Sequence, residues 1–259
     1  MSAPAIRAFE PASPRASVPD ALSIARAALQ ASTAKLMGSH SALRAFQAPE
    51  RVLSLGHAAL DAAFPDGGLP WGQVTELCVA DPSYATSISL LACARAQAEG
   101  TQAISSTREG PWCAFVDPFA SLYAPGVAQA GVALERLLVV RPPVPALSRI
   151  VVRLVEARAF ALIVVDTCSF TGRPVSGTTQ IDLAKWINVV RRLNTAIANT
   201  HSAVVLITDK NAPRPLPLPV AVRLELSCVA PGQLKVQVAK EKQGRVALPV
   251  TINCRDFVP

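Results

Sequence analysis

The sequence predicts an α/β fold, with a mostly parallel central β-sheet flanked by helices and with antiparallel strands at the C-terminal end. Two observations support this prediction. Short apolar runs typical of buried strands alternate with stretches of helical periodicity between residues 73 and 208. After a proline-rich segment, three further strand-like runs follow one another without a helix between them, which is typical of antiparallel pairing.

The expected elements can be placed in chain order. The parallel strands are expected at 73–79, 112–117, 136–141, 161–166 and 204–208, and the antiparallel ones at 222–228, 234–240 and 246–252. The run ALIVVD at 161–166 is continuously apolar, as a central strand buried on both faces should be. Helices are expected at 58–64, 83–98, 119–130, 146–158 and 182–199, and a turn at Gly67-Gly68-Leu69-Pro70.

Length and composition indicate one core domain with appendages. The chain has 259 residues, of which 51% are hydrophobic. Residues 1–19 carry four prolines among small residues and are expected to be disordered. Residues 20–50 form an N-terminal helix region, in which Asp20 caps a helix to about Leu36. The core domain is expected at 51–254 and a tail at 255–259.

Charge and cysteine usage restrict the function classes. Of the net charge of +7, +6 lies in residues 181–259, which fits either a nucleic-acid face or a solvated basic surface. The six cysteines form no CxxC pair and the three histidines are scattered, so neither disulfides nor a metal site is expected. The sequence shows no signal peptide and no apolar run of membrane-spanning length, so a cytoplasmic protein is expected.

Residues 67–91 have the layout of a nucleotide-binding unit, in which a turn, an apolar strand, a loop and a helix follow one another. A phosphate-binding loop carries glycines and a lysine between the strand and the helix. Here that loop spans residues 80–87 (ADPSYATS) and contains neither residue type. The frame of the site is present and its chemistry is missing.

Several motifs occur in the order found in RecA-type recombinases. These are SLGHAALD at 54–61, GGLPWGQVTEL at 67–77, CAFVD at 113–117, ALIVVD at 161–166 and VAKEK at 238–242. The chain therefore resembles that family over about residues 20–250, and the resemblance implies a RecA-like core.

The chain departs from the family pattern at the residues that carry the chemistry. Val79 and Tyr84 stand at glycine positions, Ala85 at the lysine position and Phe119 at the position of the catalytic glutamate. Asp209 falls where the family has a glutamine. A phosphate loop without lysine leaves the charge of the transferred phosphate uncompensated. No enzymatic activity, catalytic residue, cofactor or metal is therefore expected.

Two residues keep the family's residue type at vestigial positions. Thr86 matches the hydroxyl that holds magnesium, but a hydroxyl at a helix start is more often a cap. Asp166 ends the central strand, where magnesium-handling aspartates sit. The alternative interpretation, that Asp166 now hydrogen-bonds the neighbouring loop, is favoured.

Three basic residues are candidates for phosphate or DNA contacts. Compared with the recombinases, the second DNA-binding loop is shortened to residues 211–219, and the short first loop keeps Arg173. Lys240 and Lys242 match lysines that, in recombinase filaments, reach the ATP phosphates of a neighbouring subunit. The alternative is a strand with both lysines on a solvated face and Glu241 opposite. Weak, non-specific DNA binding is compatible with either interpretation.

A RecA-like core without the phosphate loop, the glutamate and the long DNA loop resembles the ImuA family, the RecA-related accessory factors of error-prone translesion synthesis. This resemblance implies a role in SOS mutagenesis and DNA repair, with an ImuB-type Y-family polymerase homologue and RecA as partners and, indirectly, a DnaE-type error-prone polymerase. Two other functions fit the sequence: a cell-division inhibitor that binds FtsZ, as the related SulA does, and an ATPase with an unorthodox loop.

The strand expected at 136–141 is a candidate partner-binding edge. It resembles the strand that, in RecA filaments, receives the N-terminal segment of the next subunit. The residues concerned are Leu137, Leu138, Val139, Val140 and Arg141. Strand addition supplies backbone hydrogen bonds, and side-chain pockets supply specificity. Residues 20–50 could instead cover their own core, which would leave a closed monomer.

Overall fold

The computed structural model describes residues 52–80, 82–103, 110–168, 181–212, 217–245 and 248–257. All of them belong to one compact unit, Pro49–Pro259. The expected disordered segment, the N-terminal helix region and Arg173 lie outside the described residues.

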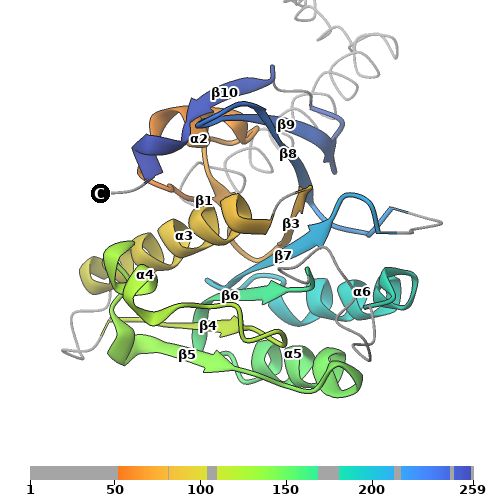
Figure 1. Cartoon of the computed structure of the whole chain (residues 1–259). Helices are drawn as coiled ribbons and strands as arrows, with labels where there is room; N and C mark the ends of the chain where they lie inside the picture. The colour runs from red at the N-terminus through yellow and green to blue at the C-terminus, as the bar shows by residue number, and fades with distance from the viewer. Residues whose placement is uncertain are drawn as a thin grey trace, which may run out of the picture. The chain divides into compact units, whose positions relative to one another are not determined.

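An eight-stranded sheet forms the centre of this unit, in the order β10-β9-β8-β3-β7-β6-β4-β5 (Figure 1). Its strands are β3 (Val74–Val79), β4 (Trp112–Val116), β5 (Leu137–Val140), β6 (Phe160–Asp166), β7 (Ala203–Asp209), β8 (Val222–Ala230), β9 (Gln233–Glu241) and β10 (Val250–Asn253). From β8 to β5 every neighbouring pair is parallel. β8 and β9, and β9 and β10, pair antiparallel. The predicted mostly parallel sheet with C-terminal antiparallel strands is thus confirmed.

Helices cover both faces of the parallel strands (Figure 1). α3 (Pro82–Ala103) and α4 (Ala124–Gln129) lie on one face, and α5 (Leu147–Glu156) and α6 (Trp186–Ile197) lie on the other. The short α2 (Ala58–Ala63) packs near β9 and β10. Short 3₁₀ turns occur at Leu134–Arg136, Val144–Ala146, Leu183–Lys185 and Cys254–Phe257. No helix in the described ranges is long and apolar enough to cross a membrane.

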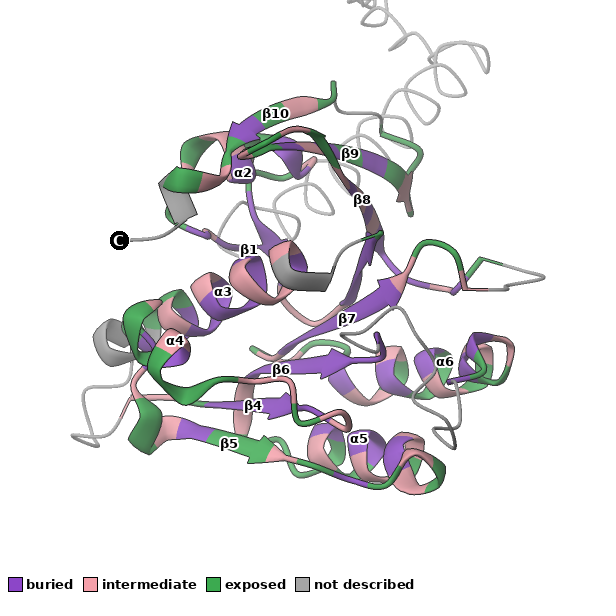
Figure 2. Cartoon of the chain, in the orientation of Figure 1, coloured by how far each residue is buried: buried purple, intermediate pink, exposed green. Residues whose placement is uncertain are grey.

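Two hydrophobic clusters result from this layering, one on each face of the sheet (Figure 2). The α3 face contains Leu77 and Phe115, whereas the α5–α6 face contains Val74 and Ala114. Successive residues of a strand point to opposite faces, so the continuously apolar runs of the sequence supply both clusters at once.

The expected turn at residues 67–70 is partly wrong. Gly67 and Gly68 do lie in the bend after α2, but Leu69 and Pro70 form the strand β2 (Leu69–Pro70). β2 pairs antiparallel with β1 (Val52–Leu53). A Cβ on Gly68 would lie 2.6 Å from the carbonyl oxygen of Leu53. Gly68 is therefore required by the close approach of two chain segments.

Some element boundaries also differ from those expected. The helix predicted at 119–130 begins only at Ala124, because Asp117 binds the backbone of the segment between β4 and α4 and holds it in a loop. The helix predicted at 83–98 continues to Ala103, and the last strand in the described ranges is Val250–Asn253.

Candidate functional site

The loop that follows β3 has a tyrosine where a phosphate site needs open space. α3 begins at Pro82, so Tyr84 lies in its first turn, half-buried and packed against the core cluster of that face. The nearby Cys254, and with it Cys228, raises the pKa of Tyr84. A ring held between the helix start and the C-terminal strands leaves no room for backbone amides to converge on a phosphate.

The position that aligns with the family's lysine is closed as well. Ala85 is fully buried in the same core cluster. A lysine there would bring an ammonium group into apolar surroundings, at a large desolvation cost. Thr86, the next residue, is half-buried in α3. The loss of phosphate-binding chemistry therefore lies in the packing of the loop as well as in its composition.

Asp166 ends β6 and is buried. Its Oδ1 accepts a hydrogen bond from the backbone N–H of Cys168 at 2.8 Å, the local contact that the favoured interpretation of this residue requires. Burial raises the pKa of Asp166 to about 7, and the nearby Asp117 adds to the increase. Burial thus disfavours the charged form of this carboxyl group.

The positions that align with the catalytic glutamate and glutamine serve packing and turn formation. Phe119 follows β4 and packs, partly buried, against the α5–α6 core cluster. Asp209 ends β7, and its Oδ1 accepts a hydrogen bond from the backbone N–H of Asn211 at 2.8 Å. Phe119 has no group that could accept a proton from water, and the Asp209 carboxylate is engaged in a local turn.

A buried polar cluster connects three central strands on the α5–α6 face. Thr208 on β7 donates its hydroxyl proton to Glu76 on β3 at 2.7 Å. Arg223 on β8 lies 3.9 Å from the other carboxylate oxygen of Glu76 and donates to the Cys78 sulfur at 3.2 Å. Glu225 then bridges Arg223 and Lys210 at 3.4 and 3.2 Å. The two carboxylates and the two cationic side chains balance in charge. The cluster therefore fixes strand pairing rather than forming a binding site.

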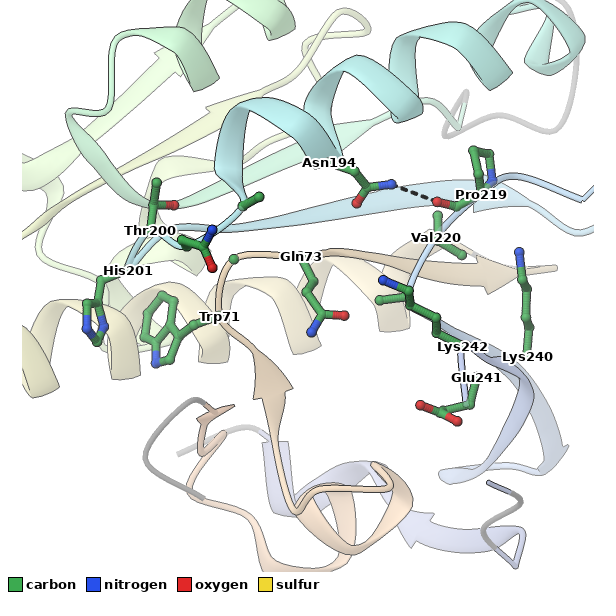
Figure 3. A pocket seen from close by; sticks show the side chains of 14 residues that line it. Trp71, Gln73, Asn194, Thr200, His201, Pro219, Val220, Lys240, Glu241 and Lys242 are labelled. Atoms are coloured by element: carbon green, nitrogen blue, oxygen red, sulfur yellow. Dashed lines mark hydrogen bonds between the residues drawn. The ribbon is translucent and has the colours of Figure 1, made fainter. Parts of the chain in front are cut away.

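Lys240 and Lys242 line a cavity of about 600 Å³ at the N-terminal end of β3 (Figure 3). The cavity is built from the turn before β3, the end of α6, the segment before β8 and the end of β9. Figure 3 shows Trp71 and His201 at one side of the cavity and both lysines at the other, with Gln73 between them. The two rings meet edge to face, with centroids 6.4 Å apart.

The alternative interpretation, in which Lys240 and Lys242 share a solvated face of the strand and Glu241 lies on the opposite face, is wrong. β9 ends at Glu241, so strand alternation does not extend to Lys242, and all three side chains line the cavity. Lys240 is half-buried and donates from Nζ to the carbonyl oxygen of Leu218 at 2.7 Å. Glu241 accepts from Gln243 and Arg245, and Lys242 is exposed. Lys242 is thus the lysine whose charge faces solvent.

This cavity and the vestigial nucleotide loop lie at opposite ends of the same strand. The cavity begins at Gln73, immediately before β3, whereas residues 80–87 follow the strand. The structure therefore does not bring Lys240 and Lys242 together with Thr86 or Asp166.

β5 lies at one edge of the sheet and pairs only with β4 among the described strands. Leu138 and Val139 are 39% and 38% exposed, whereas Leu137 is buried. Beside the edge is a cavity of about 340 Å³, lined by Leu122, Ala124, Val127, Leu134, Leu137, Val139 and Arg141. The candidate residues Leu137, Val139 and Arg141 therefore lie together at an accessible, mainly apolar site.

No group of three metal-ligating side chains occurs within the described ranges. None of the six cysteines, all of which lie in the described ranges, forms a disulfide bond; Cys78, Cys93, Cys113 and Cys168 are buried, whereas Cys228 is exposed and Cys254 is half-buried.

Comparison with known proteins agrees with this architecture. The fold and the altered loop define a class: an α/β domain of the nucleotide-binding type whose phosphate loop has been filled by side chains. The family model for the RecA N-terminal domain matches residues 26–210. The chain thus belongs to the RecA N-terminal domain family, and the predicted RecA-like core is confirmed.

The curated relatives are distant. The chain is 28% identical to the RecA protein of Desulforapulum autotrophicum over 166 residues, which is 61% of this chain and 45% of that protein. It is 35% identical to RecA of an Arthrobacter species over 130 residues, 49% of this chain and 34% of the relative. The matched region thus spans less than half the length of these relatives.

Three features of the site were not predicted from the sequence. They are the contacts of Tyr84 with two thiols, the pairing of Asp117 with Arg141, and the polar cluster around Glu76. Each joins residues far apart in the chain. The one available signal was Glu76 itself, a carboxylate within a mainly apolar run that was expected to be buried, since buried charges are normally paired.

Proposed function

We propose that this chain is a non-catalytic adaptor that supports translesion DNA synthesis during SOS mutagenesis by binding an ImuB-type polymerase homologue and RecA. The proposal combines two features of the described structure. One is a RecA-type core whose nucleotide loop is filled by Tyr84 and Ala85. The other is the exposed edge strand β5 with its apolar cavity, and this is the observation that carries the proposal.

The edge strand offers a partner both backbone groups and a pocket. Asp117 donates its backbone N–H to the carbonyl oxygen of Val140 at 2.8 Å, so the polar groups of Val140 point toward β4. Because these groups alternate along a strand, those of Val139 point away from the sheet. An added strand could therefore bond to Val139 while placing a side chain in the cavity. The resemblance to the ImuA family supplies the identity of this partner.

RecA is the second proposed partner, and it would bind at the cavity that Lys240 and Lys242 line, away from the β5 edge. The family resemblance implies that Lys240 and Lys242 reach the nucleotide of a neighbouring subunit. Their separation from the chain's own vestigial loop fits contact with another molecule. A RecA subunit carries the nucleotide that a second copy of this chain is expected to lack.

A comparative binding experiment tests the proposal. The full chain, immobilised, is offered an ImuB-type protein, RecA with a non-hydrolysable ATP analogue, and FtsZ. Binding of the first two and not of FtsZ supports the adaptor function. Binding of FtsZ alone would replace it with the division-inhibitor function. Magnesium-dependent ATP turnover that Asp166→Ala abolishes would instead favour the ATPase.

A further inference from the structure

The outer face of α5 and α6 carries a strong positive charge. The two helices pack side by side on one face of the sheet (Figure 1). Over residues 144–158 and 181–199 six exposed cationic residues stand against two acidic ones, a net charge of +4. The cationic residues are Arg149, Arg153, Arg158, Lys185, Arg191 and Arg192, and the acidic ones are Glu156 and Asp182.

The helical periodicity separates this charge from the core. α5 buries Leu147, Val151, Val152 and Val155 against the sheet, and α6 buries Trp186, Val190, Leu193 and Ile197. The cationic residues take the remaining positions and so point outward. Arg149 and Arg153 are four residues apart on α5, which places them on one side of the helix about 6 Å apart along its axis.

The acidic residues of this surface offset only part of its charge. Glu156 accepts from Arg192 at 2.6 Å, and Asp182 lies 3.5 Å from Lys185. In the part of the chain that the structure describes, no carboxylate lies within ion-pair distance of Arg149, Arg153, Arg158 or Arg191. The Glu156–Arg192 contact joins the two helices, so the charges of both form one continuous surface.

The composition of this surface indicates the class of its partner. A protein partner would need large apolar or aromatic anchors. The exposed large hydrophobic residues of the described chain lie elsewhere, and Trp186 is buried. Without exposed aromatic rings, the surface lacks the main stacking platforms that proteins use to bind single-stranded bases. Arginines with unused donors match phosphate oxygens in bidentate geometry.

We infer that the outer face of α5 and α6 binds the phosphate backbone of double-stranded DNA without sequence preference. This surface is distinct from the cavity at Lys240 and Lys242 and from the β5 edge. It would let the chain contact duplex DNA while both other sites are occupied by proteins. The inference does not depend on the proposed partner binding.

The test measures fluorescence anisotropy of a short labelled duplex of mixed sequence with the full chain, over a series of salt concentrations. Arg153→Gln/Arg191→Gln is compared with Lys235→Gln/Arg255→Gln, which removes the same charge from the β9–β10 region. The helix variant is expected to lose roughly tenfold in affinity and about 1.8 from the salt-dependence slope, whereas the control stays within about twofold of wild type.

The opposite results would overturn the inference. These are wild type that fails to bind the duplex at low salt, equal losses in both variants, or tighter binding to a single strand or to polyglutamate than to the duplex. Thermal melting followed by circular dichroism shows whether the variants fold. Arg149→Gln/Arg158→Gln is the replacement pair if the first variant does not.

Discussion

Asp117 and Arg141 tie the loop that follows β4 to the end of the edge strand. Arg141 Nε lies 3.5 Å from Asp117 Oδ2, with the carboxylate fully buried and the arginine side chain 53% exposed. The same carboxylate accepts hydrogen bonds from the backbone N–H groups of Ser121 and Leu122 and from the Ser121 hydroxyl. A single buried side chain thus organises the approach to the β5 cavity.

The two partners should contribute unequally to stability. Asp117→Asn should lower the free energy of unfolding by about 2 kcal/mol, because one amide N–H₂ would then face donors and leave buried groups unpaired. Arg141→Gln should cost less than about 1 kcal/mol, because its charge is largely solvated. Urea denaturation of both variants checks this. Equal losses would show that the ion pair, rather than the loop hydrogen bonds, dominates.

Asp166 should make stability depend on pH. Its pKa of about 7 in the folded protein lies above that of an unfolded aspartate. Between about pH 4 and pH 7 the unfolded state loses its proton first, so this residue lowers stability progressively as pH rises through that window and has no further effect above it. The stabilisation that the protonated Asp166 carboxyl contributes is fully present only below about pH 4.

Asp166→Asn should remove this dependence, since an amide oxygen can still accept from Cys168. The difference in unfolding free energy between this variant and wild type should therefore grow as pH rises from about 4 to about 7, and reach a few kcal/mol in favour of the variant. Urea denaturation at several pH values measures the gain. Asp182→Asn, at an exposed aspartate, is the control. Parallel curves for wild type and Asp166→Asn would refute the assignment.

ATP should not bind with meaningful affinity. The three causes are Tyr84 in the loop, the buried Ala85 at the lysine position and Phe119 at the glutamate position. Tyr84→Gly alone should not restore binding, because the charge that a lysine supplies would still be missing. Isothermal titration with ATP and magnesium is the measurement. Micromolar binding by wild type would contradict this prediction.

Much of the fold could be predicted from the sequence because local patterns carry it. The run at 161–166 is apolar throughout, and it forms β6 at the centre of the parallel strands. The helix at 147–156 was visible from the spacing of Leu147, Val151 and Val155. The missing glycines and lysine of the loop could also be read directly, since each depends on residue type alone.

What could not be predicted depends on contacts between distant segments. The late start of α4 follows from hydrogen bonds that Asp117 makes to the loop, where helical periodicity favoured a longer helix. The exposure of Trp112, which is 42% accessible at the start of β4, could not be read from its residue type. The basic surface combines α5 and α6, whose charges look unremarkable in either segment read separately.

Binding of the ImuB-type partner should depend on the outward backbone of β5. Val139→Pro removes the N–H that points away from the sheet and leaves the pairing with β4 intact, so affinity should fall about tenfold or more. Leu138→Asp and Val140→Asp add charge to the apolar strand and should weaken binding similarly. Val229→Asp charges an exposed valine on β8, 53% accessible, and should bind like wild type. Surface plasmon resonance with immobilised partner measures all four, and circular dichroism verifies folding. If the three β5 variants fold and bind as well as Val229→Asp, then β5 is not the docking edge.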